Sequence, residues 1–177
     1  PTNINDNYPF ASDLYTQNCQ KQYYALTSAG LSVDLISKKS SLGDYKLLVI
    51  PSLYILDADI EAKLYDFVNK GGILVGTFLT AYVNETNLCH IGGFPGKSFR
   101  KLFGIWNEGM DYLFPDESVK VKDTRSVFEI ELNGNCSTVI EQLNLEGAHS
   151  LAEADSDMHQ GSPLITKHKA GKGCSYY

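Results

Sequence analysis

The sequence predicts an α/β fold in which a parallel sheet with flanking helices is followed by short antiparallel strands in the C-terminal third. Two continuous apolar runs, at residues 46–51 and 73–78, are typical of strands covered on both faces. A helical pattern lies between them with short connections, which predicts a right-handed βαβ unit. Beyond about residue 105 the apolar segments become short and alternating, and Asp, Asn and Gly separate them, which favours antiparallel strands.

The first predicted element is a helix that begins after Ser12 and ends at Gly30. Ser12 is a suitable N-cap, and Gly30 suits the left-handed residue that follows a helix. Apolar side chains at spacings of four, four and three define its expected buried face: Tyr15, Cys19, Tyr23 and Leu26. Alternation over residues 31–35 then predicts a half-buried strand.

The second predicted helix lies between the two apolar runs. Asp57 is a good N-cap, and Asp59 and Glu61 fall in the first turn, where the helix dipole favours negative charge. The expected buried stripe consists of Ile60, Leu64, Phe67 and Val68. Gly71 and Gly72 end the helix. These carboxylates are therefore interpreted as helix-start residues.

The last third predicts strands at 118–123, 126–132, 137–143 and 148–154, then a hairpin over 162–177 that turns at Ala170 to Gly173. The chain is expected to be a single domain over 1–177, with an α/β core over 1–115 and a β-rich extension over 116–177. It begins at Pro1 and ends at Tyr177 in an apparent strand, so we expect a fragment of a longer polypeptide.

Composition excludes several classes of partner. With 15 basic and 21 acidic residues the net charge is -6, and no basic stripe exists, which argues against nucleic acid. The longest apolar run, Leu47–Ile50, is far shorter than the roughly 20 residues of a membrane helix. The cysteines lack metal spacing and are expected to be free thiols in a reducing, cytoplasmic compartment: Cys19, Cys89, Cys136 and Cys174.

The segment IGGFPGKSF at 91–99 ends like a phosphate-binding loop, with Gly96, Lys97 and Ser98. The motif needs a glycine five residues before its last glycine, where this chain has Ile91. It must also follow a buried strand, and the preceding NETNLCH is too polar. We therefore expect a turn into a short helix near Lys97, and no nucleotide.

Parallel sheets of this kind also carry the cysteine nucleophile of class I glutamine amidotransferases, on a sharp turn after a buried strand. At that place the chain has Thr77, Phe78 and Leu79, so the thiolate is absent. Cys89 and His90 are neighbours in sequence, and adjacent side chains usually point apart. Amidotransferase chemistry is therefore not predicted for the turn at residues 77–79 or for Cys89.

Other titratable residues also have ordinary interpretations. Asp116 and Glu117 are turn residues, and Glu129 and Glu131 are more consistent with a solvated strand face than with a glycosidase pair. The histidines His149, His159 and His168 have no metal-like spacing. No catalytic, cofactor-binding or metal-binding residue is predicted, and no cofactor.

Three blocks in order resemble one known family: residues 23–37 with 44–57, then 68–111, then QGSPLITKHKAGKGCSYY at 160–177. Together they are similar to the middle, trimerisation domain of glycoside hydrolase family 42 β-galactosidases. The resemblance implies an amidotransferase-like (flavodoxin-like) fold without the nucleophile, which holds three subunits together. It also implies that a separate barrel binds the galactoside and carries both catalytic glutamates of a retaining mechanism.

The chain departs from the family pattern at its start. The family's first strand normally precedes the first helix, and NINDNYPFAS at 3–12 has no apolar run to replace it. We therefore expect that strand to be missing or to lie outside this sequence. The loop at Val83–Asn84–Glu85 is a candidate for contact with a neighbouring active site.

Two other functions remain open from the residues alone. One is a free-standing amidotransferase-like enzyme that uses Cys89 or Cys19. The other is a sugar-binding module built on exposed aromatic residues, namely Tyr82, Phe94, Trp106 and Tyr112. Packing in a core or interface is the preferred interpretation of these aromatic side chains.

Overall fold

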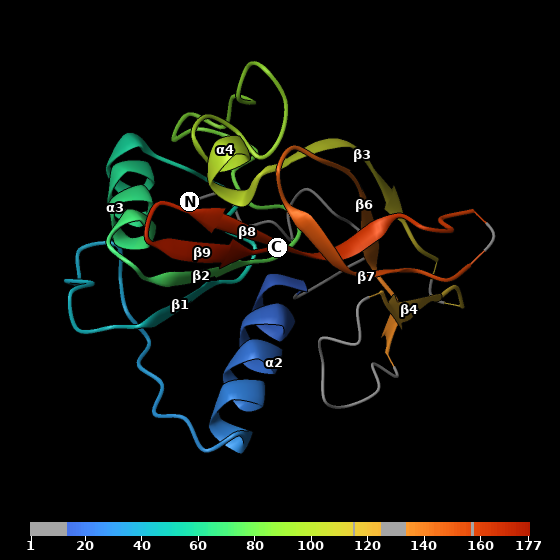
Figure 1. The fold of residues 1–177 in the computed structure, drawn as a ribbon, viewed down its shortest axis with the longest axis horizontal. Coiled ribbons are helices and arrows are strands. Elements are labelled where there is room, and N and C mark those ends of the chain that lie inside the picture. The colour runs from blue at the N-terminus through green and yellow to red at the C-terminus, as the bar shows by residue number, and fades with distance from the viewer. Residues whose placement is uncertain (1–13, 115, 125–133, 157) are drawn as a thin grey trace.

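The computed structural model describes residues 14–114, 116–124, 134–156 and 158–177 (Figure 1). Within these ranges the helices are α2 (Leu14–Ser28), α3 (Ala58–Asn69) and α4 (Phe99–Phe103). The strands are β1 (Leu47–Ile50), β2 (Ile73–Gly76), β3 (Ile105–Tyr112), β4 (Val119–Asp123), β5 (Asn135–Cys136), β6 (Val139–Leu145), β7 (His149–Ala154), β8 (Pro163–Ala170) and β9 (Gly173–Tyr176).

The main sheet has the order β1-β2-β9-β8-β7-β4-β5, and β3 pairs with β6 in a second, two-stranded sheet. Among the described strands, β1, β2 and β9 run parallel, whereas the other neighbours in the two sheets pair antiparallel. The fold is therefore mixed α/β with a mostly antiparallel sheet, and the expected parallel sheet is reduced to three strands among the described residues. The reason is the C-terminal hairpin, which places β9 beside β2 and brings β8 with it.

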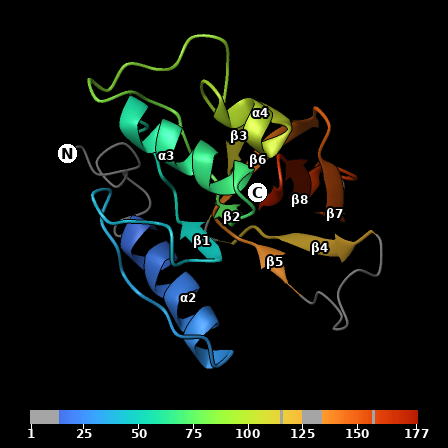
Figure 2. The ribbon, with the colours of Figure 1, turned by 60° about the vertical axis from the view of Figure 1, so that its left-hand side comes forward.

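The helices lie on both sides of the parallel strands. α3 and α4 lie on one side of β1 and β2, and α2 lies on the other (Figures 1 and 2). The main core fills the space under α3 and α4, where its largest fully buried side chains include Phe99, Phe103 and Leu74. None of the helices in the described ranges is long and apolar enough to cross a membrane.

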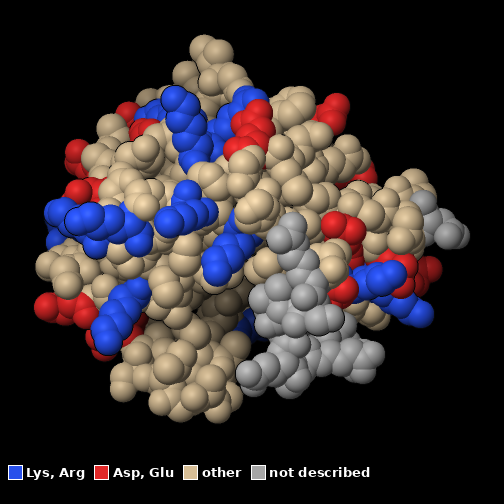
Figure 3. All heavy atoms as spheres, viewed as in Figure 1, with Lys and Arg blue, Asp and Glu red and all other residues tan. Residues whose placement is uncertain are grey.

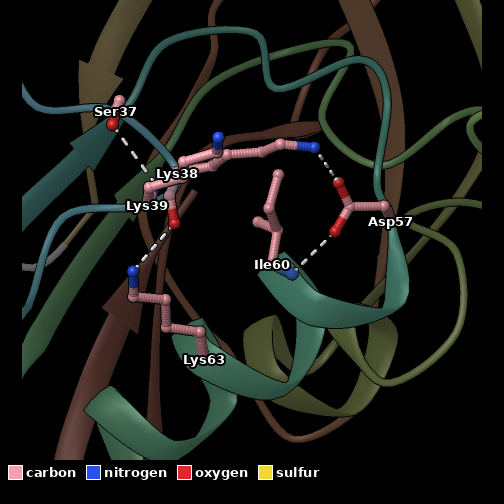
Figure 4. A network of polar contacts seen from close by, with 6 residues as sticks. All are labelled: Ser37, Lys38, Lys39, Asp57, Ile60 and Lys63. Carbon is pink, nitrogen blue, oxygen red and sulfur yellow. Dashed lines mark hydrogen bonds and ion pairs between the residues drawn. The ribbon is translucent and has the colours of Figure 1, made fainter.

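The prediction for α3 is confirmed. Asp57 Oδ1 accepts a 2.8 Å hydrogen bond from the Ile60 backbone N–H, as an N-cap should. The predicted stripe packs into the core, with Leu64, Phe67 and Val68 buried. The Asp57 carboxylate also pairs with Lys38 at 3.0 Å, and this contact ties the segment before β1 to the start of α3 (Figure 4).

Two predictions near the start of the chain are wrong. Residues 31–35 form no strand, and the Leu35 side chain is 87% exposed. α2 buries Leu14 and Asn18 rather than the predicted face, on which Tyr15 and Tyr23 are exposed. The physical reason is shared, because α2 and the segment after it stand apart from β1. The expected cap Ser12 lies outside the described residues.

The C-terminal third follows the predicted strand pattern closely. β4, β6 and β7 coincide with three of the four expected segments, while 126–132 lies outside the described residues. β8 and β9 form the expected hairpin, with Ala170 opposite Gly173. β3 and β5 were not predicted. The division into 1–115 and 116–177 stays a prediction, although β9 shares one sheet with β1 and β2.

Candidate functional site

The chain makes a strained turn after β2, at the carboxyl end of the parallel strands. Leu79 has φ 61° and Ala81 has φ 59°, values that non-glycine residues rarely adopt. Both side chains are fully buried. The sharp point of the turn is thus Leu79, one of the three residues named for this place from the sequence. An aliphatic side chain provides no nucleophile, so this turn is built for packing.

A buried carboxylate from the second sheet holds this turn. Glu141 Oε1 accepts hydrogen bonds from the Leu79 backbone N–H at 2.9 Å and from the Tyr82 hydroxyl at 2.8 Å. Its Oε2 accepts from the Tyr177 hydroxyl at 2.7 Å. Asn107 Nδ2 donates to the Tyr82 hydroxyl at 2.6 Å. The network therefore joins four separate elements at one side chain.

Burial sets the ionisation of this network. Desolvation raises the pKa of Glu141 above its usual range, and the hydrogen bonds from its four neighbours oppose that rise. The pKa of Tyr177 is also raised, chiefly by burial and then by the nearby carboxylate. Every polar atom of the carboxylate has a partner, which is the pattern of a structural network rather than of a reactive acid.

Two of the aromatic side chains proposed for sugar binding, Tyr82 and Phe94, pack on one another. Tyr82 is 6% exposed and lies between Tyr54 and Phe94, with ring centroids 5.9 Å and 4.1 Å away. Trp106 lies under the Arg100 guanidinium, 5.4 Å from the ring centroid. These contacts support packing, and they leave no flat aromatic platform for a sugar ring at Tyr82.

Cys89 and His90 face different surroundings. The Cys89 side chain is exposed, whereas His90 is 9% exposed and packs on the backbone of Gly96. The buried His90 Nε2 has no hydrogen-bond partner, and burial lowers the pKa of this imidazole. The pair therefore makes no catalytic dyad. Cys19 is partly buried on α2 and lines the groove described below.

The glycine-rich segment forms no phosphate cradle. Lys97 pairs with Glu61 Oε2 at 3.4 Å, and the Ser98 backbone N–H donates to Glu61 Oε1 at 3.0 Å. Gly92 and Gly93 have positive φ, and a Cβ on Gly93 would meet Trp106 Nε1 at 2.5 Å. The segment leads into α4, a five-residue helix, as the expected turn.

The remaining titratable candidates lie apart. His168 Nδ1 contacts the Leu102 carbonyl at 3.0 Å, and His159 lies 3.8 Å from Asp111. Glu117 accepts from a turn N–H, while Glu129 and Glu131 lie outside the described residues. No group of three or more potential metal ligands occurs in the part of the chain that the structure describes. The prediction of no catalytic or ligand-binding residue stays a prediction.

An open groove of about 690 Å³ separates α2 and the segment 31–38 from β1. Its lining is largely apolar and includes Tyr15, Cys19, Tyr23, Leu26, Leu31 and Leu35. Within the described residues, β1 pairs on one side only, with β2. The apolar face predicted for α2 therefore lines this groove instead of the core.

Sequence reasoning missed Glu141, the central residue of the polar network. It lies in the segment STVIEQL, where an alternating strand pattern predicts an outward-facing glutamate. In the structure Ile140 and Glu141 are both buried, so both faces of β6 are covered at this point. Its partners lie 36 to 62 residues away, so no local signal identifies it.

The fold defines a class of protein, a mixed α/β domain whose main sheet is mostly antiparallel. The chain matches the family model described as the β-galactosidase trimerisation domain over residues 3–177, and it belongs to that family.

Curated relatives agree with the family match. β-Galactosidase BgaA of Planococcus sp. (strain 'SOS Orange') is 36% identical over 171 residues, which cover 96% of this chain and 25% of the relative. β-Galactosidase BglY of Alicyclobacillus acidocaldarius is 35% identical over 165 residues, covering 92% of this chain and 24% of the relative. The chain thus spans about a quarter of the length of these relatives.

Solved structures show the same relationship. The β-galactosidase from Bacillus circulans sp. alkalophilus superposes with a TM-score of 0.88 at 32% identity, covering 92% of this chain and 24% of that chain. The β-galactosidase from Rahnella sp. R3 gives a TM-score of 0.88 at 33% identity, covering 93% and 24%.

Proposed function

We propose that the chain is the assembly unit of a homotrimeric β-galactosidase, and that the catalytic barrel lies outside residues 1–177. The observation that carries this proposal is the match of residues 3–177 to a trimerisation domain. The packed turn at Leu79 supports it, since that turn offers no nucleophile. The galactoside and both catalytic glutamates then belong to the barrel, and this chain holds three copies beside one another.

The molar mass of the chain in solution, measured by light scattering behind a sizing column, tests this proposal. A mass near three chains at micromolar concentration supports assembly within residues 1–177. The same measurement on the natural polypeptide that contains the chain is the control. If both proteins are monomers, the proposal is wrong. If only the longer polypeptide forms a trimer, residues outside 1–177 also contribute to the assembly contact.

The parallel strands belong, in this proposal, to an amidotransferase-like (flavodoxin-like) sheet that is larger than β1, β2 and β9. The support is the open edge of β1 together with the apolar groove beside it. A strand from outside residues 1–177 would pair with β1 and bury the lining of α2. Exposed apolar sheet edges are otherwise a hazard for aggregation.

A cytoplasmic location and a single structural unit over 1–177 complete the proposal. The four cysteines are free thiols in the structure, which is the usual state in a reducing compartment. Their state in the protein purified without reductant, read by thiol titration, tests this point. Four reactive thiols per denatured chain are expected, and two disulfides would contradict a reducing location.

A further inference from the structure

The loop between β2 and α4 carries a tight hairpin at residues 83–91, called the 83–91 tip below. Val83 and Cys89 form an antiparallel bridge, and the Asn84 backbone N–H donates to the Leu88 carbonyl at 2.9 Å. The Asn84 Oδ1 atom accepts from the backbone N–H groups of Thr86 and Leu88 at 2.9 and 3.0 Å. The tip therefore has a defined internal hydrogen-bond pattern.

The base of the tip is fixed to the body of the domain. The backbone N–H of Val83 and that of Tyr82 both donate to the Tyr54 carbonyl, at 3.1 and 3.0 Å. Tyr82 stacks between Tyr54 and Phe94 and bonds to Glu141. The loop rises above α4 in Figure 1 and above α3 in Figure 2. The tip is thus a rigid projection.

This ordered projection presents aliphatic side chains to solvent. Ile91 is 102% exposed and Leu88 is 65% exposed. The uppermost part of the face in Figure 3 shows neither blue nor red, and Glu85 is the only charged residue of the 83–91 tip. Ordering costs little when a rigid loop binds, because its conformation is already fixed.

We propose that the 83–91 tip, through Leu88 and Ile91, is a subunit contact that packs on a second copy of the same polypeptide. This inference rests on the proposed function. A closed threefold assembly uses heterologous contacts, in which a projection of one copy meets a different surface of the next. The family match supplies the second copy as the occupant. The apolar groove between α2 and β1, called the α2 groove below, is a different kind of surface from the tip. The unpaired edge of β1 borders it, so its expected partner is a strand.

The exposed thiol of Cys89 gives a direct probe, because it lies between Leu88 and the buried His90. The experiment uses the natural polypeptide that contains residues 1–177, and follows its molar mass and the rate at which a maleimide labels Cys89. In the trimer, Cys89 labelling is expected to be at least ~10-fold slower than in a diluted monomer, because a contact covers the tip. A Cys89→Ser variant identifies this thiol among the four.

The decisive variant is Leu88→Asp with Ile91→Asp, which leaves Asn84 and the base of the tip intact. We expect its trimer dissociation constant to rise by at least ~10-fold, since buried carboxylates oppose association. Met158→Asp is the matched control, because Met158 is 91% exposed and lies outside the tip. Circular dichroism of each monomer verifies that the fold is retained.

The outcomes separate the two proposals. A wild-type trimer that the double variant dissociates supports the tip contact. A trimer in which Cys89 labels as fast as in the monomer, and which the double variant leaves intact, overturns the tip contact but keeps the trimer. An intact variant trimer with a changed KM for a nitrophenyl galactoside also overturns it, in favour of contact with a neighbouring active site. A wild-type monomer overturns both proposals.

Discussion

The backbone N–H of Leu79 donates a 2.9 Å hydrogen bond to Oε1 of Glu141, a residue 62 positions later. Leu79 holds a left-handed conformation that costs about 1–3 kcal/mol and persists only where its surroundings fix it. Glu141 supplies that constraint from β6. One buried carboxylate therefore couples the turn after β2 to the second sheet and to the C-terminal Tyr177.

The Glu141 network predicts a dependence of stability on pH. The folded-state pKa of Glu141 is raised above its ordinary value of 4.5. The protonated side chain therefore contributes to the free energy of unfolding in full below pH 4.5, and this contribution is lost as pH rises through the folded-state pKa. Relative to wild type, Glu141→Gln is expected to lack this decline, whose slope is at most about 1.4 kcal/mol per pH unit.

Urea unfolding of both proteins between pH 4 and pH 8 measures this difference. Glu108→Gln on the exposed side of β3 is the control for exchanging a glutamate for a glutamine. If the difference in unfolding free energy between Glu141→Gln and wild type does not change with pH, the pKa of Glu141 is the same in the folded and unfolded states, and the prediction is wrong.

The Tyr82 hydroxyl predicts a cost that is separate from ring stacking. Tyr82→Phe keeps the stack with Tyr54 and Phe94 but removes the donor to Glu141 and the acceptor for Asn107. We expect a loss of about 1–3 kcal/mol of unfolding free energy, because buried partners lose their hydrogen bonds. Tyr54→Phe is the matched control and should change stability by less than about 0.5 kcal/mol. Equal effects in the two variants would contradict the role of the network.

The elements that could be predicted are those whose structure is determined by residues within the segment itself. Asp57 lies at an N-cap position and the stripe from Ile60 to Val68 has helical spacing, so α3 was predictable from a dozen residues. The hairpin of β8 and β9 follows from alternation around a glycine turn. In both cases the interactions that fix the element lie within the segment itself.

Distant contacts decided what the sequence did not predict. Alternation at 31–35 identifies strand-like residues, but a strand also needs a neighbour, and β1 stands across an open groove. The parallel sheet was overestimated because β9 brings an antiparallel partner into it. Glu141 was missed because its partners come from two remote segments, the turn after β2 and the C-terminus, and strand spacing alone would place its side chain in solvent.

His90 predicts a loss of stability in acid. Burial and the charge of Lys97 lower the pKa of the imidazole below its ordinary value of 6.5, while Glu61 and Glu85 act in the opposite direction. A depressed pKa contributes stability above 6.5, and this is lost as pH falls through the folded-state value. In His90→Phe, whose ring fills similar space, the fall between pH 7 and pH 5 should be smaller than in wild type.

Thermal unfolding at pH 7 and pH 5 measures the effect of His90→Phe. Nε2 has no partner in the structure, so at pH 7 the variant gives up only the hydrogen bond between the imidazole and the Val83 backbone, and the expected loss is about 1 kcal/mol. His149→Phe, at an exposed position of β7, is the control for exchanging a histidine for a phenylalanine. An identical acid response in wild type and His90→Phe would assign the response to other groups.

The α2 groove predicts that Cys19 changes its accessibility with the length of the polypeptide. Cys19 lines the groove beside β1, and in the chain 1–177 its thiol is only partly buried. If a strand from outside these residues pairs with β1, the lining is covered, and thiol labelling then requires local opening. We expect Cys19 to react at least ~10-fold faster in the chain 1–177 than in the natural polypeptide.

Cys136 is the control thiol for overall stability. It is partly buried and lies away from the groove, so it should label at the same rate in both proteins. Equal rates for Cys19 would mean that the groove stays open in the longer protein, and that β1 is an edge strand there too.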